Sequence, residues 1–492
     1  MSTSISGAVF RTASEIPSAV AVDDGTTTLT YATLASTAEV VASNLAAVGA
    51  SGATVAVCLG RSATAIAVLL GVIRAGCAYV PIDPRAPRSR REFVVADSGA
   101  AALITDTQFD LDLPTLSSAD ACAGKYPSQL VAHPDHAEPV YIIYTSGSTG
   151  VPKGVVVTHA NVANLASWHI RAFGLDTRSR VAQFAPLSFD ASAWEIWPCL
   201  IAGGSLHLVP EALRSFQSSL VRWIGETRIS HTFLPTPVAE AALDELVARP
   251  GDLRWLLTGG DRLRRFDPGL QCRFVNAYGP TEATVLATAG VVPSEAEATT
   301  PLPSLGRAIQ NVAVYVLDPD LEQVAEGEIG ELCIAGAGVA SGYRGRPDEE
   351  NLRFVTWRER RIYRTGDLGR RLAGGEFYFE GRGDRQVKLR GHRVELAELE
   401  VGALALPGVT GAAAIAVPDH DEVALFVTSE LDQVGAAAVL AHLRTVVPRQ
   451  VLPRVVVVQD LPQTSHGKID HTALERLAIH SSQQKGGVSG GR

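Results

Sequence analysis

The stretch Tyr144-Thr-Ser-Gly-Ser-Thr-Gly-Val-Pro-Lys-Gly154 carries more chemical information than any other part of this 492-residue chain. It follows an apolar run that begins at Pro139 and predicts a buried strand entering a turn. Glycines and hydroxyl residues dominate the loop, so its backbone N–H groups can turn inward as an anion-binding nest, with hydroxyls as further donors. Lys153 adds a positive charge suited to phosphate. The sequence therefore predicts a phosphate loop.

The spacing of this loop differs from the Walker pattern, because no Ser or Thr follows Lys153. A Gly/Ser-rich surface loop is the alternative interpretation, and the Pro-Lys-Gly ending argues against it. Only five of the 43 basic residues are lysines, and three of them, Lys153, Lys388 and Lys468, occur in motif-like settings. A compact, movable ammonium group is what arginine cannot imitate, so we expect these lysines to have specific roles.

The composition is that of a globular protein, with 46% hydrophobic and 19% charged residues, and the length predicts two or more domains. The net charge of −9 and the lack of a basic run predict no nucleic-acid or membrane partner. No signal-peptide pattern and no apolar span of the ~18 residues that a membrane helix needs are found. The six cysteines are scattered. We expect a cytoplasmic protein with free thiols and no transition-metal site.

Short apolar runs alternate with helical patterns along most of the chain, which predicts parallel βαβ packing. Strands are expected near residues 54–58, 101–105, 181–184, 229–234, 254–257 and 273–275. The later ones end in turns rich in Gly or Pro, and in open α/β sheets ligands bind beyond the carboxyl ends of the strands. These turns are therefore the expected walls of one site. From about residue 311 the pattern changes to strand and turn, and Gly381-Arg-Gly-Asp384 is the expected domain boundary.

The phosphate loop and its companion motifs, in order across residues 29–470, resemble the adenylate-forming enzymes. Within that superfamily the chain resembles a stand-alone amino-acid adenylation domain of the nonribosomal-peptide type. The resemblance implies an α/β fold: a large N-terminal domain of α/β subdomains with a β-rich subdomain, and a small mobile α+β C-terminal domain. The expected bounds are 1–383 for the adenylation core, 384–478 for the mobile domain and 479–492 for a disordered tail.

The implied activity is that of a ligase of nonribosomal peptide and antibiotic biosynthesis. It uses ATP and Mg²⁺ to convert an amino acid into aminoacyl-AMP with release of pyrophosphate, and then forms a carbon–sulfur bond to a carrier protein's phosphopantetheine thiol. No Leu-Gly-Gly-x-Ser carrier motif follows Asp470, so the carrier is expected on a separate chain. The need for a small MbtH-like activator protein stays open.

The resemblance assigns roles residue by residue. The phosphate loop comprises Thr145, Ser146, Gly147, Ser148, Thr149, Gly150 and Lys153. Tyr278 would stack on adenine, and other nucleotide contacts would come from Gly260, Asn276, Gly279, Thr281, Asp367 and Arg382. Glu282 would bind Mg²⁺, which prefers oxygen ligands. Asp384 would be the hinge. Lys468 would bridge the substrate carboxylate and the α-phosphate, acting with Thr145, Lys153 and Glu282 as the catalytic set.

Phe189-Asp190-Ala191-Ser192 distinguishes the amino-acid branch from the acyl-CoA ligases. Asp190 has aromatic and apolar neighbours, where an unpaired carboxylate is costly to bury, and the α-ammonium of an amino acid is its natural partner. The remaining pocket positions are uncharged and mostly apolar: Ala191, Trp194, Phe233, Leu257, Gly259, Ala277, Val285 and Leu286. This set most resembles leucine-selecting pockets. Ala277 stands where Asn is usual, which leaves valine, isoleucine or a modified leucine open.

Two other functions compete with this interpretation. An acyl- or aryl-CoA ligase would share the fold, and Asp190 argues against it. A catalytically silent ATP-binding scaffold is the alternative from another class. The joint presence of Glu282, Asp367 and Lys468 with the phosphate loop argues against it.

Lys468→Ala is expected to lower adenylate formation by at least about 10²-fold, the scale for losing one preorganised charged donor. Acyl transfer from preformed adenylate should fall far less, because a lysine on the mobile domain would be withdrawn before the thiol approaches. Single-turnover assays of the two half-reactions separate these effects. Equal losses in both steps would contradict a role confined to the first.

Overall fold

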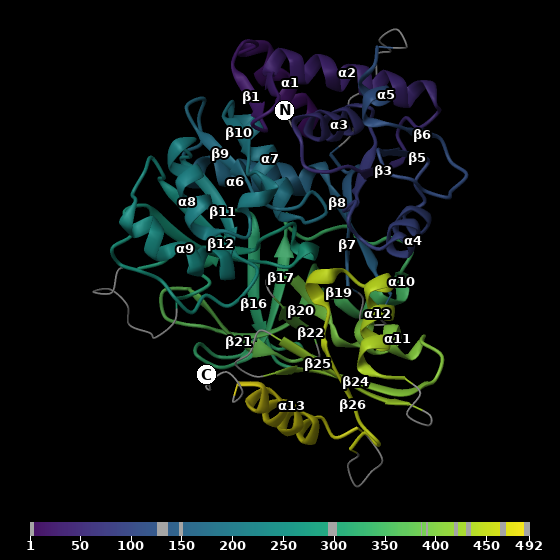
Figure 1. Cartoon of the computed structure of the whole chain (residues 1–492). Coiled ribbons are helices and arrows are strands. Elements are labelled where there is room, and N and C mark those ends of the chain that lie inside the picture. Colours follow the sequence, from purple (N-terminus) through teal and green to yellow (C-terminus); the bar gives the residue numbers. More distant parts are fainter. Residues whose placement is uncertain are drawn as a thin grey trace, which may run out of the picture. The chain divides into compact units, whose positions relative to one another are not determined.

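The computed structural model describes residues 4–124, 136–146, 151–293, 303–384, 386–389, 392–417, 422–429, 434–462 and 469–486. The chain divides into two compact units (Figure 1). Unit 1 comprises residues 1–84, 94–144 and 154–383, and unit 2 comprises residues 85–93, 145–153 and 384–492. The cut between Gly383 and Asp384 falls at the turn that the sequence singled out as a boundary.

A nine-stranded sheet carries the predicted βαβ rhythm of unit 1, in the order β15-β14-β13-β12-β11-β9-β10-β1-β2. The strands from β13 to β1 pair in parallel, which confirms the predicted packing. β2, β14 and β15 add antiparallel edges. The bounds are β1 (Val20–Asp23), β2 (Thr28–Thr30), β9 (Arg180–Gln183), β10 (Ser205–Leu208), β11 (His231–Pro235), β12 (Trp255–Gly259), β13 (Arg273–Tyr278), β14 (Thr288–Val291) and β15 (Arg307–Ala308).

A second, seven-stranded sheet has the order β18-β8-β7-β4-β3-β5-β6. Its pairs from β7 to β6 are parallel, as the early strands predicted. The predicted strand before the phosphate loop is β7 and ends at Thr145, while β8 begins at Lys153. The bounds are β3 (Thr54–Cys58), β4 (Ala78–Pro81), β5 (Ala102–Thr105), β6 (Thr115–Leu116), β7 (Pro139–Thr145), β8 (Lys153–Thr158) and β18 (Gly342–Tyr343).

The two faces of the nine-stranded sheet bury different helices because successive side chains on a strand point to opposite faces. On β12, Leu257 joins the large hydrophobic cluster that also contains residues of the seven-stranded sheet, while Leu256 joins a second cluster with α8 and α9. Figure 1 shows α8 and α9 together beside β11 and β12. The helices of the large cluster are α1 (Ile5–Glu15), α2 (Tyr31–Ala47), α3 (Ala63–Arg74), α5 (Ser118–Cys122), α6 (His159–Phe173) and α7 (Ala191–Ala202); the second cluster takes α8 (Gln217–Glu226) and α9 (Thr236–Ala248).

Tyr31 begins α2 and has a structural role. Its ring is buried, and its hydroxyl lies 3.0 Å from the carbonyl oxygen of Leu200 and 2.9 Å from that of Gly204. These carbonyls belong to the C-terminal end of α7, where helix carbonyls lack partners within the helix. Tyr31 therefore ties the N-terminal helices to the helix that begins after Asp190.

The predicted β-rich subdomain is a five-stranded sheet of the order β16-β17-β20-β19, with β21 paired to β20. Antiparallel pairing of β20 and β21 sets Asp367 opposite Arg382. The bounds are β16 (Val312–Leu317), β17 (Gly330–Gly336), β19 (Phe354–Trp357), β20 (Arg360–Arg371) and β21 (Phe377–Arg382), with α10 (Pro347–Arg353) before β19.

The C-terminal part of unit 2 contains a two-stranded sheet, β22-β23, and a three-stranded sheet, β24-β25-β26. On β24, Ala412 and Ala414 belong to the cluster with α11 and α12, while Ala413 and Ile415 belong to the cluster with α13. The bounds are β22 (Gln386–Leu389), β23 (His392–Glu395), β24 (Val409–Val417), β25 (Glu422–Ser429), β26 (Arg454–Val457), α11 (Leu396–Leu404), α12 (Ala436–Val446) and α13 (His471–Gly486).

The expected disordered tail from residue 479 is corrected in its first part. α13 continues to Gly486, and it packs through Leu474 and Ala478 against the apolar face of the three-stranded sheet. Composition alone suggested disorder because a stretch rich in Ser, Gln and Gly has little apolar surface to bury, whereas packing of the first helical turns stabilises the rest. Residues 487–492 lie outside the described residues.

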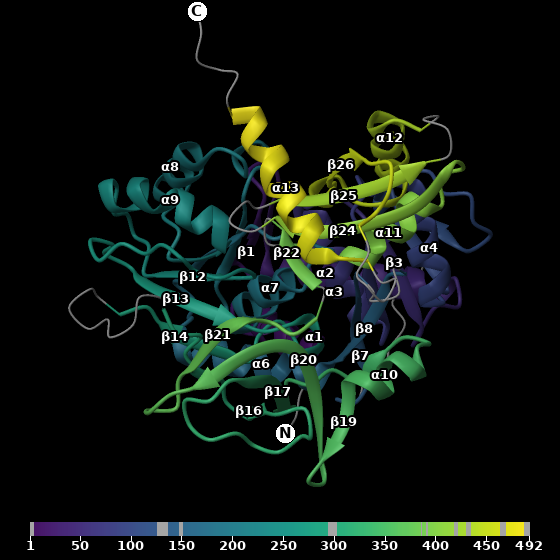
Figure 2. The same ribbon diagram turned by 90° about the horizontal axis from the view of Figure 1, so that it is seen from below.

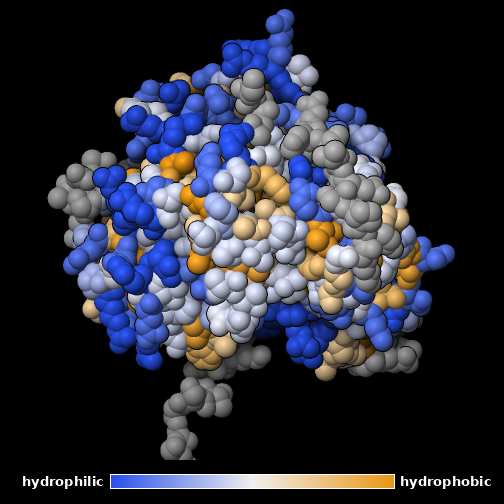
Figure 3. Space-filling view, turned by 90° about the horizontal axis from the view of Figure 1, so that it is seen from above, coloured by the Kyte–Doolittle hydropathy of each residue, from blue (hydrophilic) through white to orange (hydrophobic). Residues whose placement is uncertain are grey.

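None of the helices within the described residues has both the length and the apolar character that crossing a membrane requires. On the face drawn in Figure 3, hydrophobic residues occur in small groups separated by hydrophilic ones.

Candidate functional site

The predicted site residues gather where parallel strands of the nine-stranded sheet end. The register sets Phe233 on β11 opposite Leu257 on β12, and Gly259 opposite Ala277 on β13. β12 and β13 are adjacent in Figure 2. The residues expected as pocket walls belong to one hydrophobic cluster: Ala191, Trp194, Phe233, Leu257, Ala277, Val285 and Leu286. The structure therefore brings together side chains from five separate segments of sequence.

Close backbone contacts leave no space for a side chain at two glycines of this region. A Cβ on Gly259 would lie 2.5 Å from the carbonyl oxygen of Ala277, and a Cβ on Gly279 would lie 2.3 Å from the Cα of Leu286. Any larger residue at either position would have to push backbone aside. In the same cluster the rings of Trp194 and Phe233 have centroids 5.3 Å apart.

The turn that carries Asp190 is held by the helix that follows it. The carboxylate of Glu195 on α7 accepts hydrogen bonds from the backbone N–H of Phe184 at 3.0 Å and of Ala185 at 3.0 Å. Ser192 Oγ donates to the carbonyl oxygen of Phe189 at 2.7 Å. Burial raises the pKa of Glu195 to about 8, against the opposing effect of these N–H donors. The turn between β9 and α7 is thereby fastened at both ends.

Asp190 occupies the N-cap position of α7 and is half-buried. Its side chain makes no capping hydrogen bond to the helix backbone. Its negative charge acts on Tyr141 of β7, whose pKa is raised first by complete burial and then by Asp190.

The residues predicted for the nucleotide form a second group on β13, β20 and β21. The hydroxyl of Tyr278 donates to Asp367 Oδ2 at 2.7 Å, and Arg382 pairs with Asp367 Oδ1. Burial, followed by the charge of Asp367, raises the pKa of Tyr278, so the phenol stays protonated and acts as the donor. Asp367 is 2% exposed. An aromatic ring, a carboxylate and a guanidinium thus meet at one point.

Two neighbours complete this group. Asn276 donates from Nδ2 to the carbonyl oxygen of Ser304 at 2.8 Å, which fixes its amide. Gly260 follows β12 with φ +91, a backbone conformation that other residues rarely adopt. Gly279 and Thr281 continue from Tyr278 toward the short helix η2 (Thr281–Ala283).

Glu282 lies in η2 and is fully buried. Its Oε1 accepts a hydrogen bond from the hydroxyl of Tyr343 at 2.7 Å. In the described part of the chain, no group of three or more His, Cys, Asp or Glu side chains could hold a metal by itself. A single anchored carboxylate suits Mg²⁺, which commonly takes one or two carboxylates and completes its shell with phosphate oxygens and water. The donor set therefore fits that ion when a nucleotide is bound.

The phosphate loop is described at its two ends only. Thr145 ends β7, Ser146 follows it, and Lys153 begins β8 as a buried residue. Residues 147–150, with Gly147, Ser148, Thr149 and Gly150, lie outside the described residues, as does Lys468.

Tyr144, the last residue before the loop, is anchored within unit 1. It donates to Asp97 Oδ2 at 2.8 Å, and Arg346 donates to Asp97 Oδ1 at 2.7 Å. The ring of Tyr144 also packs over Gly154, where an added Cβ would come within 3.0 Å of ring atoms. Both flanks of the loop are therefore joined.

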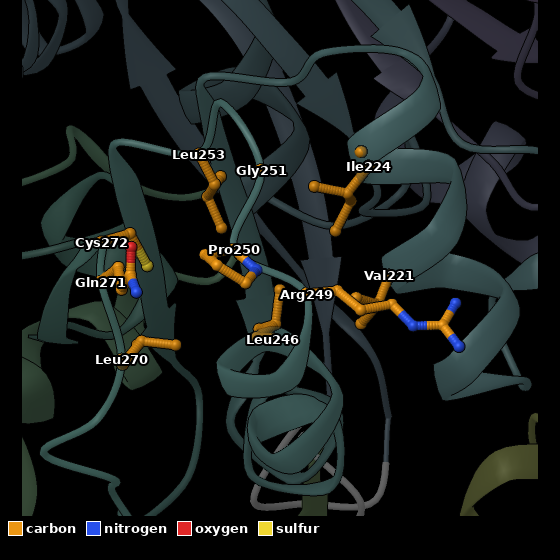
Figure 4. A pocket seen from close by; sticks show the side chains of 11 residues that line it. Val221, Ile224, Leu246, Arg249, Pro250, Gly251, Leu253, Leu270, Gln271 and Cys272 are labelled. Atoms are coloured by element: carbon orange, nitrogen blue, oxygen red, sulfur yellow. The ribbon is translucent and has the colours of Figure 1, made fainter.

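A separate hollow beside α8 and α9 contains none of the predicted site residues (Figure 4). Its walls include Val221, Ile224, Leu246 and Leu253, together with the polar residues Arg249 and Gln271.

Sequence reasoning missed three residues that support the site: Glu195, Tyr343 and His169. Tyr343 and Glu282 are 61 positions apart, and nothing in either local pattern indicates the contact. Glu195 was readable only as a helix residue beside the Asp190 motif. A buried acid in an apolar helix, such as Glu195 in residues 191–202, is the one signal that could have found it.

The fold is that of an adenylate-forming enzyme. Its strand-end loops carry both the residues predicted to bind the nucleotide and the apolar residues that follow Asp190. The chain belongs to the AMP-binding enzyme family: the model "AMP-binding enzyme" matches residues 9–344, and the model "AMP-binding enzyme C-terminal domain" matches residues 398–468. Enzymes of this family use ATP, and the homologues of the chain are nonribosomal peptide synthetase adenylation modules.

Bacitracin synthase 1 of Bacillus licheniformis is 37% identical over 94% of this chain, and surfactin synthase subunit 2 of Bacillus subtilis (strain 168) is 39% identical over 84%. The matches cover 9% and 12% of those two proteins, so the chain spans a small part of their length. Among solved structures, holo-PA1221, an NRPS protein containing adenylation and PCP domains, has a TM-score of 0.84 and 29% identity, over 96% of this chain and 84% of that one.

Tyr278→Phe keeps the aromatic face and removes the donor to Asp367. A hydrogen bond to a charged group contributes about 1.5–3 kcal/mol, so we expect ATP to bind roughly tenfold more weakly. Isothermal titration calorimetry with ATP measures the change. The matched control is Tyr315→Phe on β16, which removes a hydroxyl that accepts an exposed hydrogen bond from Arg360 of β20. This variant should bind ATP as the wild type does. An unchanged ATP affinity in Tyr278→Phe would show that Asp367 needs no help from this hydroxyl.

Proposed function

We propose that this enzyme activates an aliphatic L-amino acid, with leucine the best substrate, as aminoacyl-AMP. It then transfers the aminoacyl group to the phosphopantetheine thiol of a separate carrier protein. The observation that carries the proposal is the place of Asp190, which is half-buried at the N-cap position of α7 and next in sequence to Ala191 of the apolar cluster. An α-ammonium group beside Asp190 would leave the side chain of the amino acid toward the apolar walls.

The walls favour an aliphatic side chain. The seven clustered residues carry no charge, and the rings of Trp194 and Phe233 stand together with centroids 5.3 Å apart, while Gly259 and Ala277 are among the smallest residues of the predicted set. Leucine, isoleucine and valine differ by one methylene or its position, so an apolar pocket separates them by only ~1–3 kcal/mol. A charged side chain would have no partner among these residues and would lose its hydration.

The nucleotide is proposed to lie against the second group. Tyr278 would stack on adenine beside Gly260 and Asn276, and Asp367 with Arg382 would hold the ribose. Glu282 would hold Mg²⁺, whose charge screens the phosphates during attack by the substrate carboxylate. Thr145, Ser146 and Lys153 would face the phosphates with the rest of the loop. The chain's own contribution to the rate is positioning and charge stabilisation.

The two steps are assigned to two arrangements of the domains. Residues 1–383 would bind ATP and the amino acid, and residues 384–478 would bring Lys468 to the carboxylate and α-phosphate for the first step. Rotation about Asp384 would then withdraw Lys468 and admit the carrier thiol. Holo-PA1221 contains adenylation and PCP domains in one protein, which supports a carrier protein as the partner.

The test is an ATP–pyrophosphate exchange panel of the proteinogenic amino acids with purified enzyme. Leucine should be best, isoleucine, valine or methionine detectable, and aspartate, lysine and phenylalanine near background. A charged or aromatic winner would overturn the assignment of the pocket. Formation of a CoA thioester without carrier protein would favour the CoA-ligase alternative.

Asp190→Ala should weaken amino-acid binding by several kcal/mol, because it removes the buried partner of a positive charge. The matched substrate change is 4-methylpentanoate, which is leucine without its ammonium group. The wild type should activate 4-methylpentanoate as poorly as Asp190→Ala activates leucine. Exchange kinetics for both measure the effect. Equal activation of 4-methylpentanoate and leucine by the wild type would contradict amino-acid selectivity at Asp190.

A further inference from the structure

His169 on α6 lies behind Trp194 on α7, and the two helices pack together (Figure 1). The indole Nε1–H of Trp194 donates to Nδ1 of His169 at 2.6 Å. The two rings stand perpendicular, with an interplanar angle of 90° and centroids 5.6 Å apart. His169 is 4% exposed and Trp194 is 2% exposed. This polar contact is therefore sealed inside the hydrophobic cluster.

The imidazole is itself held from behind by aromatic rings. Phe173, one turn along α6, has its centroid 4.7 Å from that of His169, and Trp255 on β12 lies 4.9 Å beyond Phe173. Edge-to-face packing of this kind fixes ring planes as well as distances. Trp194 thus stands between an immobile histidine on one side and Phe233 on the other.

The protonation state of His169 suits this role. Burial, with a smaller effect from the charge of His231, lowers the pKa of His169 to about 3. The ring is therefore neutral throughout the range in which enzymes of this kind are assayed. Its Nδ1 lone pair can accept the indole hydrogen only in this neutral form, with the ring hydrogen on Nε2.

We propose that His169 is a specificity-determining positioning residue, which holds the indole of Trp194 in one orientation and thereby sets the depth of the side-chain pocket. A buried indole N–H must find an acceptor. Without His169 the indole would turn toward another acceptor and open the wall against Phe233. The inference deepens the proposed function and rests on Trp194 lining the substrate pocket.

Two variants separate the acceptor from the packing. His169→Phe keeps a ring in the aromatic stack and removes the acceptor, whereas His169→Gln keeps an acceptor oxygen. The control is His207→Phe, which removes a different buried histidine. His207 is on β10 and contacts Ser205 and Asp23. His207 is 3% exposed, so its replacement tests the general cost of losing a buried imidazole.

The first measurement needs no turnover. Enzyme labelled with ¹⁵N in its tryptophan indoles gives signals from six tryptophans, and Trp194→Phe assigns the relevant one. In the wild type, His169→Gln and His207→Phe, this signal should be exchange-protected. In His169→Phe it should shift and lose protection. An unchanged Trp194 signal in His169→Phe would overturn the positioning role.

The second measurement is selectivity, the ratio of kcat/KM for the acid that the wild type prefers to kcat/KM for a homologue one or two carbons larger. His169→Phe should lower this ratio by at least ~10-fold, the scale of one methylene in an apolar pocket, mainly through KM. His169→Gln and His207→Phe should stay within ~3-fold of the wild type on the same scale. An unchanged ratio in a His169→Phe enzyme with an altered Trp194 signal would overturn the role in specificity.

The two measurements also separate this inference from the proposed function. If the panel shows a preferred acid other than an aliphatic amino acid, the proposed function fails, and the ratio is measured with that acid and its larger homologue. If leucine is preferred and the ratio does not move, only the role of His169 fails.

Discussion

Parallel pairing of β9, β11, β12 and β13 is the constraint on which the site depends. It places the carboxyl ends of all four strands at one edge, so residues separated by about a hundred positions in sequence become neighbours. The register tolerates little change at this edge, because the Ala277 carbonyl approaches the place where any side chain on Gly259 would begin. The pairing of the strands thus fixes where the loops begin, whatever residues the loops contain.

The sequence was sufficient to predict this framework and most of the residues at its edge. Strand positions followed from apolar runs such as residues 54–58, which match β3 residue for residue. Gly and Pro after the runs located the loops, because these residues act on the local backbone. Features written in short stretches of sequence were thus recoverable without coordinates.

Side-chain partners could not be predicted in the same way. The bond between Tyr278 and Asp367 spans 89 positions and the one between Tyr343 and Glu282 spans 61, and each depends on how separate elements pack. The same applies to His169, which alone is only a histidine on a helix with apolar neighbours. The expected tail failed for a related reason, since α13 is stabilised by apolar contacts that its composition does not reveal. The roles of Lys468 and residues 147–150 stay predictions.

Three buried carboxyl groups near the candidate site each accept hydrogen bonds from donors on other residues. Glu195 accepts from backbone N–H groups, Glu282 from a tyrosine hydroxyl, and Asp367 from a tyrosine hydroxyl and an arginine. Each donor offsets part of the cost of burying a polar carboxyl group and also restricts its rotation. A carboxylate oriented before the ligand arrives loses less freedom on binding, so the same contacts serve stability and positioning.

The turn after Glu282 joins the carboxylate proposed to bind Mg²⁺ to Val285 and Leu286 of the proposed substrate pocket. Thr284 and Val285 both have positive φ, 54 and 74, which is unfavourable for β-branched residues and costs on the order of 1–3 kcal/mol each. The strain is held by a 2.7 Å hydrogen bond from Thr284 Oγ1 to the Gly338 carbonyl and by the close approach of Leu286 to Gly279. Relaxing this turn would move Glu282 at one end and Val285 with Leu286 at the other. A backbone held in such a conformation cannot adjust one end alone, so the carboxylate proposed to bind Mg²⁺ and the residues proposed to contact the substrate side chain keep a fixed relation to each other.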